Sequence, residues 1–111
     1  MKTGSLTKDL VYNDNKPNIT VLLKTKQSKE IRIVMRKGQL MKEHKAPFPI
    51  VIEVFEGAID FGVNGERLQL LKGDMIALDE NIPHDLIGIQ DSIVRLSLSQ
   101  KDTVGRVENI A

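Results

Sequence analysis

Cysteine and aromatic residues are scarce in this chain: there is no cysteine, and aromatic residues make up only 4% of the sequence. Without cysteine, neither a disulfide framework nor a thiolate metal site can form. The aromatic rings are too few for a stacking platform on single-stranded nucleic acid. A net charge of +1, from 16 basic and 15 acidic residues, gives no electrostatic footprint for nucleic acid or an anionic membrane. Neither is therefore an expected partner.

Long apolar runs and the usual nucleophile motifs are also missing. No stretch approaches the about 20 apolar residues that a membrane helix needs, and the first residues lack the apolar core of a signal peptide. We therefore expect a cytoplasmic protein. No serine lies in a Gly-x-Ser-x-Gly setting and no glycine-rich phosphate loop is present, so the sequence assigns no catalytic residue.

The length and composition are those of one ordinary globular domain. With 111 residues, 41% of them hydrophobic and 28% charged, the chain can bury a modest core. Residues 1–17 are polar and uneven, and we interpret them as an N-terminal arm with a short strand around residues 10–12. Residues 18–99 form the predicted domain. Residues 100–111 are interpreted as a loose, polar C-terminal tail.

Inside the domain, hydrophobic residues recur with a period of two, which is typical of strands. Ile31, Ile33 and Met35, for example, share one face of a predicted strand. Asn64-Gly65 supplies the two positive-φ positions of a tight hairpin turn between two alternating runs. Eight or nine short strands and no long amphipathic helix predict an all-β antiparallel sandwich or barrel.

Two glycine-anchored motifs resemble the signatures of the cupin superfamily. In the first cupin motif, a glycine is followed after five residues by His-x-His, and then by a glutamate and a second glycine. The same spacing in this chain holds Gly38, His44, Ala46, Ile50 and Gly57. The spacing is kept throughout, but an alanine replaces the second histidine and an isoleucine replaces the glutamate.

The second cupin motif runs from a glycine through Pro-x-Gly to a histidine and an asparagine. In "LKGDMIALDENIPH" the matching glycine and histidine are Gly73 and His84, and Gly88 stands at the asparagine position. The resemblance covers roughly residues 30–99 and implies a small RmlC-like cupin, an antiparallel double-stranded β-helix or jelly-roll barrel. Because this fold hosts many activities, it does not by itself assign a function.

The resemblance also implies a metal site. In metal-binding cupins, the positions that match His44 and His84 point into the barrel and hold a divalent ion, here zinc, nickel, manganese or iron. A typical cupin site has three histidines and one glutamate, and neither Ala46 nor Ile50 can donate a lone pair. Since a catalytic metal usually needs three protein ligands, two imidazoles would hold an ion loosely. Glu43 would join them only if its strand were bulged.

Strand alternation around the two histidines predicts the rest of a ligand pocket. The side chains expected to line it with His44 and His84 are Lys42, Ala46, Ile50, Ile52 and Met75. Lys42 would make the pocket cationic and suited to a carboxylate or a phosphate. Met75 would be a soft apolar lining. Val51, Glu53 and Phe55 are expected to face outward.

Three functions remain open. The first is a small-molecule-binding protein with the two histidines as polar groups of a mostly apolar pocket. The second is a metal-dependent cupin enzyme of dioxygenase, isomerase or decarboxylase type. The third is a metal-free isomerase or epimerase with a histidine as the base. We rank them in this order because two metal ligands are missing and no carboxylate partner for a histidine base is visible.

A homodimer is the expected assembly. Outward-facing Val51 and Phe55, together with the apolar side of residues 93–99, give more apolar surface than one small barrel can hide. Two barrels packed through a twofold axis would bury that surface. Small cupins are typically dimers, so the resemblance points the same way.

Overall fold

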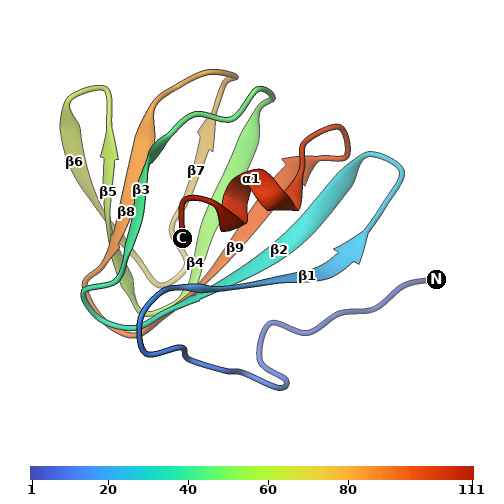
Figure 1. Ribbon diagram of the computed structural model, residues 1–111, viewed down its shortest axis with the longest axis horizontal. Coiled ribbons are helices and arrows are strands. Elements are labelled where there is room, and N and C mark those ends of the chain that lie inside the picture. Colours follow the sequence, from blue (N-terminus) through green and yellow to red (C-terminus); the bar gives the residue numbers. More distant parts are fainter.

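The computed structural model describes residues 1–111, which form nine strands and one short helix (Figure 1). The elements are β1 (Asn18–Lys24), β2 (Ser28–Met35), β3 (Leu40–His44), β4 (Ile50–Glu56), β5 (Ala58–Val63), β6 (Glu66–Leu71), β7 (Met75–Leu78), β8 (His84–Gly88), β9 (Ser92–Ser99) and α1 (Val104–Glu108). All strand pairings are antiparallel. The predicted all-β class is confirmed, but no strand forms at residues 10–12. Helix α1 lacks the length and apolar character needed to cross a bilayer.

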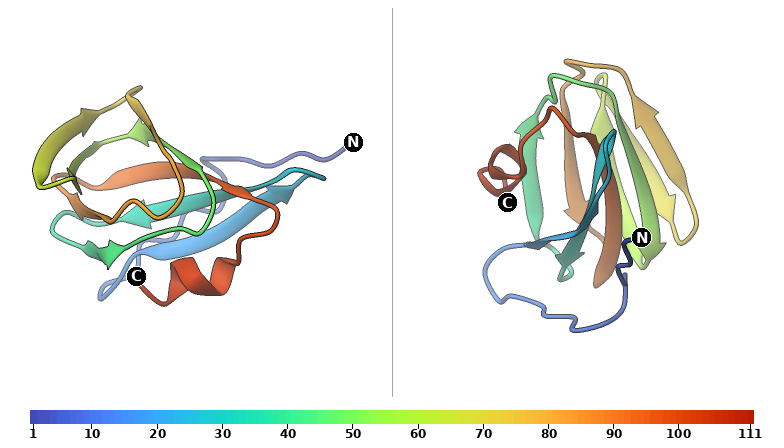
Figure 2. Two further views of the ribbon diagram at one scale, coloured as in Figure 1. Left: turned by 90° about the horizontal axis from the view of Figure 1, so that it is seen from above. Right: turned by 90° about the vertical axis from the view of Figure 1, so that its right-hand side faces the viewer.

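The strands form two sheets that face each other (Figure 2). Sheet A has the strand order β1-β2-β9-β4-β7, and sheet B has the order β3-β8-β5-β6. The hydrophobic core lies between them, where alternate side chains of each strand point inward. The motif histidines belong to β3 and β8, two neighbouring strands of sheet B, and this arrangement places them together.

Burial along β4 follows the predicted alternation. Ile50, Ile52 and Val54 are 4%, 2% and 0% exposed, whereas the residues between them are partly exposed on the outer face of sheet A. On β9, the apolar face of residues 93–99 also points into the core. That face is therefore unavailable to a partner subunit, contrary to part of the sequence-based argument for a dimer.

Two turns depend on residues that tolerate positive φ. Asn64 and Gly65 have φ values of 53° and 74°, so the predicted β5–β6 hairpin is confirmed. Gly57, between β4 and β5, has φ of 91°, and a Cβ there would lie 2.3 Å from Ser92 Oγ. That hydroxyl accepts a hydrogen bond from the Ala58 N–H and donates one to the Ala58 carbonyl. The motif glycine thus permits a close contact that fixes β5 against β9.

The N-terminal arm packs on the outer face of sheet A. The guanidinium of Arg32, a residue that is only 4% exposed, donates hydrogen bonds to the carbonyls of Ser5 and Lys8. Val34, on the same outward face of β2, is 0% exposed. The arm therefore buries a face that strand alternation alone would leave in solvent.

The C-terminal residues are not a loose tail, contrary to the sequence-based expectation. Figures 1 and 2 show α1 at the side of the sandwich where the edge strands β1 and β3 lie. Val107 is 1% exposed within the core cluster, and the Ile110 carbonyl accepts a hydrogen bond from the Lys42 N–H of β3. Val107 anchors the segment in the core, and Val104, Ile110 and Ala111 pack against the same cluster, so a segment that looks polar overall is held by its few apolar residues.

Candidate ligand pocket

His44 and His84 face each other across the β3–β8 pair. They are register partners, and their ring centroids are 4.1 Å apart with the planes at 63°. Phe61 of β5 stacks on the other side of His84, with the centroids 5.7 Å apart and the planes at 18°. Three adjacent strands of sheet B therefore hold the imidazole of His84 in one orientation.

A β-bulge in β3 decides which of its side chains reach the pocket. The register shifts between Met41 and His44, so these two residues, three apart, both point inward. Lys42 and Glu43 lie on the exposed side of the strand. The bulge therefore places Lys42 outside the pocket, contrary to prediction, and it does not bring Glu43 in.

Both imidazoles have a defined tautomer. His44 Nδ1 lies 2.5 Å from the Lys42 carbonyl, and His84 Nδ1 lies 2.8 Å from the Ile82 carbonyl. Because a carbonyl only accepts hydrogen bonds, each Nδ1 carries the proton and each Nε2 has a free lone pair. His84 Nε2 is buried and has no hydrogen-bond partner. A buried polar atom without a partner is costly, so it marks a position that suits a donor from a ligand.

Burial keeps both imidazoles neutral. It lowers the pKa of His44 to about 4, and the positive charge of Arg106 and the neighbouring His84 act in the same direction, while the hydrogen bond to the Lys42 carbonyl partly opposes them. Burial also lowers the pKa of His84, with Arg106 adding to the effect. Near neutral pH the pair is therefore uncharged and offers lone pairs rather than N–H donors at Nε2.

The space in front of the histidines is apolar and small. Its volume is about 10 Å³, close to the minimum that holds one water molecule. The lining side chains come from both sheets and from α1: Ile33, Met41, His44, Ile50, Ile52, His84, Leu86, Leu96, Arg106 and Val107. Val107 is thus one wall of a cavity that holds no more than about one water molecule.

Arg106 is the one permanently charged group of the pocket. Its Nε and Nη2 donate to the two carboxylate oxygens of Asp102 at 2.8 and 2.7 Å, and its Nη1 is buried without a partner. Asp102 is 2% exposed. Burial alone would raise the pKa of Asp102, but the hydrogen bonds from Arg106 and from the Thr103 N–H outweigh it and lower that pKa. The bidentate pair therefore fixes the guanidinium at the pocket wall.

The residues of this pocket do not fit a divalent metal ion. Only His44 and His84 offer ligands that suit a divalent ion, since the thioether of Met41 is a soft donor, and nowhere in the chain do three His, Cys, Asp or Glu side chains converge to hold an ion. Ile50 lines the pocket where the cupin signature has a glutamate. An ion would also meet the positive charge of Arg106. Two imidazoles beside a guanidinium fall short of the three protein ligands that a catalytic metal usually has.

The structure brings some of the sequence-predicted pocket residues together and separates others. His44, His84, Ile50 and Ile52 line one cavity, whereas Ala46 is buried in the core without lining it. Met75 is 57% exposed, because it pairs with Glu53 on the outer face of sheet A. Its assignment to the pocket is therefore corrected.

Sequence reasoning missed the contribution of α1. Arg106 and Val107 lie in a segment that has no strand periodicity and no signature spacing. The only local signal is an Asp-x-x-x-Arg spacing, which favours an ion pair on one helix face but says nothing about what the helix covers.

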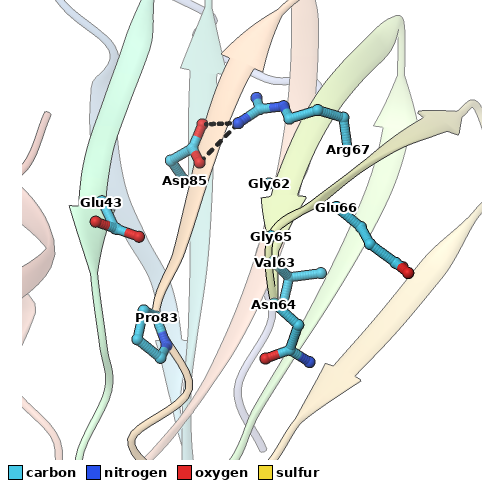
Figure 3. A pocket seen from close by; sticks show the side chains of 9 residues that line it. All are labelled: Glu43, Gly62, Val63, Asn64, Gly65, Glu66, Arg67, Pro83 and Asp85. Carbon is cyan, nitrogen blue, oxygen red and sulfur yellow. Dashed lines mark hydrogen bonds and ion pairs between the residues drawn. The ribbon is translucent and has the colours of Figure 1, made fainter.

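A second hollow lies outside the barrel, along β3, β5, β8 and the β5–β6 turn (Figure 3). It measures about 430 Å³ and has one hydrophobic residue among the nine that line it. Arg67 crosses Gly62 to reach Asp85 at 2.8 Å and Asp60 at 3.0 Å, so the one cationic side chain of this hollow is already paired with two carboxylates. We therefore place the candidate site inside the barrel, where polar atoms are buried and unpaired.

No family model matches this chain, and no curated protein matches it. Solved structures do. An RmlC-like cupin protein from Desulfovibrio desulfuricans is similar with a TM-score of 0.81 and 19% identity, covering 89% of this chain and 96% of that one. An RmlC-like cupin family protein with a double-stranded β-helix fold from Methanocaldococcus jannaschii has a TM-score of 0.73 and 14% identity, covering 89% and 90%. KdgF from Halomonas sp. has a TM-score of 0.70 and 20% identity, covering 75% and 77%. At these identities the likeness concerns the fold alone.

Proposed function

Because this chain has the cupin fold, a small double-stranded β-helix, we propose that it binds a small organic molecule inside the barrel. His44 and His84 orient the ligand, and the aliphatic side chains of both sheets enclose it. Ligand sites of this kind are mostly apolar with a few convergent polar groups. The observation that carries the proposal is the buried Nε2 of His84, which faces this cavity without a partner.

Binding is favoured over catalysis by the chemistry of the two imidazoles. A general base works best with a pKa near the operating pH, and burial lowers the pKa of His44 to about 4. Neither Nδ1 contacts a carboxylate that would stabilise an imidazolium, since both donate to backbone carbonyls. Such histidines are weak bases and good hydrogen-bond acceptors, as a binding pocket requires.

A ligand screen by thermal shift tests this proposal. A ligand at about 100 times its dissociation constant stabilises the native state by about 2.7 kcal/mol, which a melting curve resolves readily. Compounds that raise the melting temperature of the wild type should lose their effect on the His44→Leu/His84→Leu variant, which has nearly the same side-chain volume but lacks both Nε2 acceptors. Glu66→Gln, in the outer hollow, is the matched control and should keep the effect. Hits that bind the double variant equally well would place the ligand elsewhere.

We also propose that the protein is a homodimer through the outer face of sheet A. Val51 and Phe55 of β4 are partly exposed there, beside the exposed Met75 of β7. Burying these side chains against a second copy would remove apolar surface from water. Phe55→Asp should convert the dimer to a monomer on gel filtration. An unchanged elution volume for a dimeric protein would remove Phe55 from the interface.

A further inference from the structure

Two residues that line the same cavity, His84 and Arg106, each carry a buried polar atom, and the two atoms are of opposite character. His84 Nε2 can only accept a hydrogen bond in its neutral tautomer, and Arg106 Nη1 can only donate one. Neither has a partner. A molecule between them satisfies both atoms only if it offers an acceptor to the guanidinium and a donor to the imidazole. This requirement narrows the chemistry of the ligand.

The charges around Arg106 favour a negatively charged acceptor. Asp102 neutralises the guanidinium, but the ammonium of Lys29 also donates to the Asp102 carbonyl. These three side chains together therefore carry one excess positive charge. The charge of Arg106 also acts on both imidazoles, where it disfavours their protonation. One carboxylate placed against Arg106 Nη1 would neutralise this excess positive charge, and a hydrogen bond between two charged groups is stronger than one between neutral groups.

We propose that the ligand of this pocket is a small hydroxycarboxylate. This inference rests on the proposed function and names its ligand class. The carboxylate accepts from Arg106 Nη1, and the hydroxyl group donates to His84 Nε2. Because the residues of this site do not fit a metal ion, the positive charge that binds the carboxylate comes from the guanidinium of Arg106. A simple fatty acid lacks the donor for His84, and a neutral polyol or a water molecule can hydrogen-bond to both atoms but leaves the excess positive charge unbalanced.

Val107 sets the size limit of the site. A cavity of about 10 Å³ is smaller than any hydroxycarboxylate, and Val107 lines it from α1. A helix of five residues has little stability of its own, so its position depends on tertiary contacts. The Asp102–Arg106 pair lies before Val107 in the chain, and the single backbone contact to β3 comes after it, at Ile110. Displacing Val107 therefore need not break the Asp102–Arg106 pair.

Titration with three two-carbon probes tests the inference. Glycolate carries both groups, glycolamide lacks the charge and acetate lacks the hydroxyl. The host is the full chain with Val107→Ala, which enlarges the pocket, and binding is followed by NMR shifts of the His44 and His84 side chains, with His44 alone as the reporter in variants that lack His84. We expect glycolate to bind about 10–100-fold more tightly than glycolamide, the range for a charge-assisted hydrogen bond. The wild type should show the same order at weaker affinity, which keeps the test valid if Val107→Ala folds poorly.

Three substitutions in the same host separate the contributions. Arg106→Gln should abolish the preference for glycolate over glycolamide, and His84→Phe should abolish the preference for glycolate over acetate. Arg67→Gln removes an arginine that is also paired with aspartates but lies outside the barrel, and it should change neither preference.

The possible failures are distinguishable. Neutral compounds that shift the His84 signals as strongly as glycolate, or a glycolate preference that survives Arg106→Gln, would overturn the hydroxycarboxylate while leaving the barrel site intact. If no compound shifts the signals of either histidine, the inference and the proposed function are both wrong.

Discussion

Replacing Val107 by alanine is the most direct test of whether the C-terminal segment is part of the fold. Val107 is 1% exposed in the core cluster. Losing two methyl groups removes about 1.6 kcal/mol of transfer free energy. If the space they leave, about 40 Å³, does not collapse, it costs about 1 kcal/mol more. Alanine is the better helix former by about 0.5 kcal/mol, which acts in the opposite direction. The net loss in the free energy of unfolding is therefore about 2 kcal/mol.

Urea unfolding of the wild type and two valine variants measures this loss. With a slope of about 2 kcal/mol per M, typical of small proteins, the midpoint of Val107→Ala should fall by about 1 M. Val11→Ala is the control, since Val11 is 53% exposed on the N-terminal arm, and its midpoint should stay nearly unchanged. If Val107→Ala is as stable as Val11→Ala, or more stable because of helix propensity alone, α1 does not close the barrel and the argument for a sealed pocket fails.

Three further outcomes follow from particular contacts. Gly57→Ala should destabilise the fold by about 3 kcal/mol or more in urea unfolding, because its Cβ would meet Ser92 Oγ at 2.3 Å at a φ of 91°. Gly38→Ala is the control, since Gly38 has a similar φ but open space around it. An equally large loss for Gly38→Ala would show that the clash with Ser92 is not the cause. The free energy of unfolding should fall by about 1–2 kcal/mol as the pH drops from 6.5 to 4, because in this range His44 binds a proton in the unfolded state but, with its pKa lowered to about 4, largely stays neutral in the half-buried native site. His44→Phe should make this loss of stability smaller. If the loss is unchanged in the variant, it arises from other groups. Mass spectrometry of untagged protein should find far less than one metal ion per chain, and one ion per chain that disappears in His44→Ala/His84→Ala would contradict the metal-free site.

Most of the fold could be predicted from the sequence because strand burial is a local pattern. Alternation identified the inward faces of β2 and β4, and Asn64-Gly65 identified the β5–β6 hairpin, whereas the apolar face of β9 was expected outside and lies in the core. The resemblance of the two glycine-anchored motifs to the cupin signatures implied that His44 and His84 point into one barrel, and the structure pairs them across β3 and β8. Strand alternation was compatible with this arrangement but did not by itself require it.

The mistaken pocket residues show where alternation stops being informative. A bulge after Met41 changes which residues of β3 point inward, and the sequence around Lys42 gives no indication of this bulge. In β7 both faces are apolar, so the pattern could not choose between Met75 and its neighbour Ile76, which packs against the core. In both strands the face that points inward depends on pairing with a distant strand.

By itself, the sequence determined the all-β class, the inward faces of β2 and β4 and the β5–β6 hairpin, because these follow from residue type and spacing along the chain; the pair of histidines came from the resemblance to the cupin signatures. Only the tertiary structure decided what surrounds those histidines. Segment 100–111 looks polar and unremarkable, yet α1 places Arg106 and Val107 against His84. The physical reason is that one buried valine and one buried ion pair gain their stability from contact with both sheets, and contacts between distant segments leave no local pattern to read.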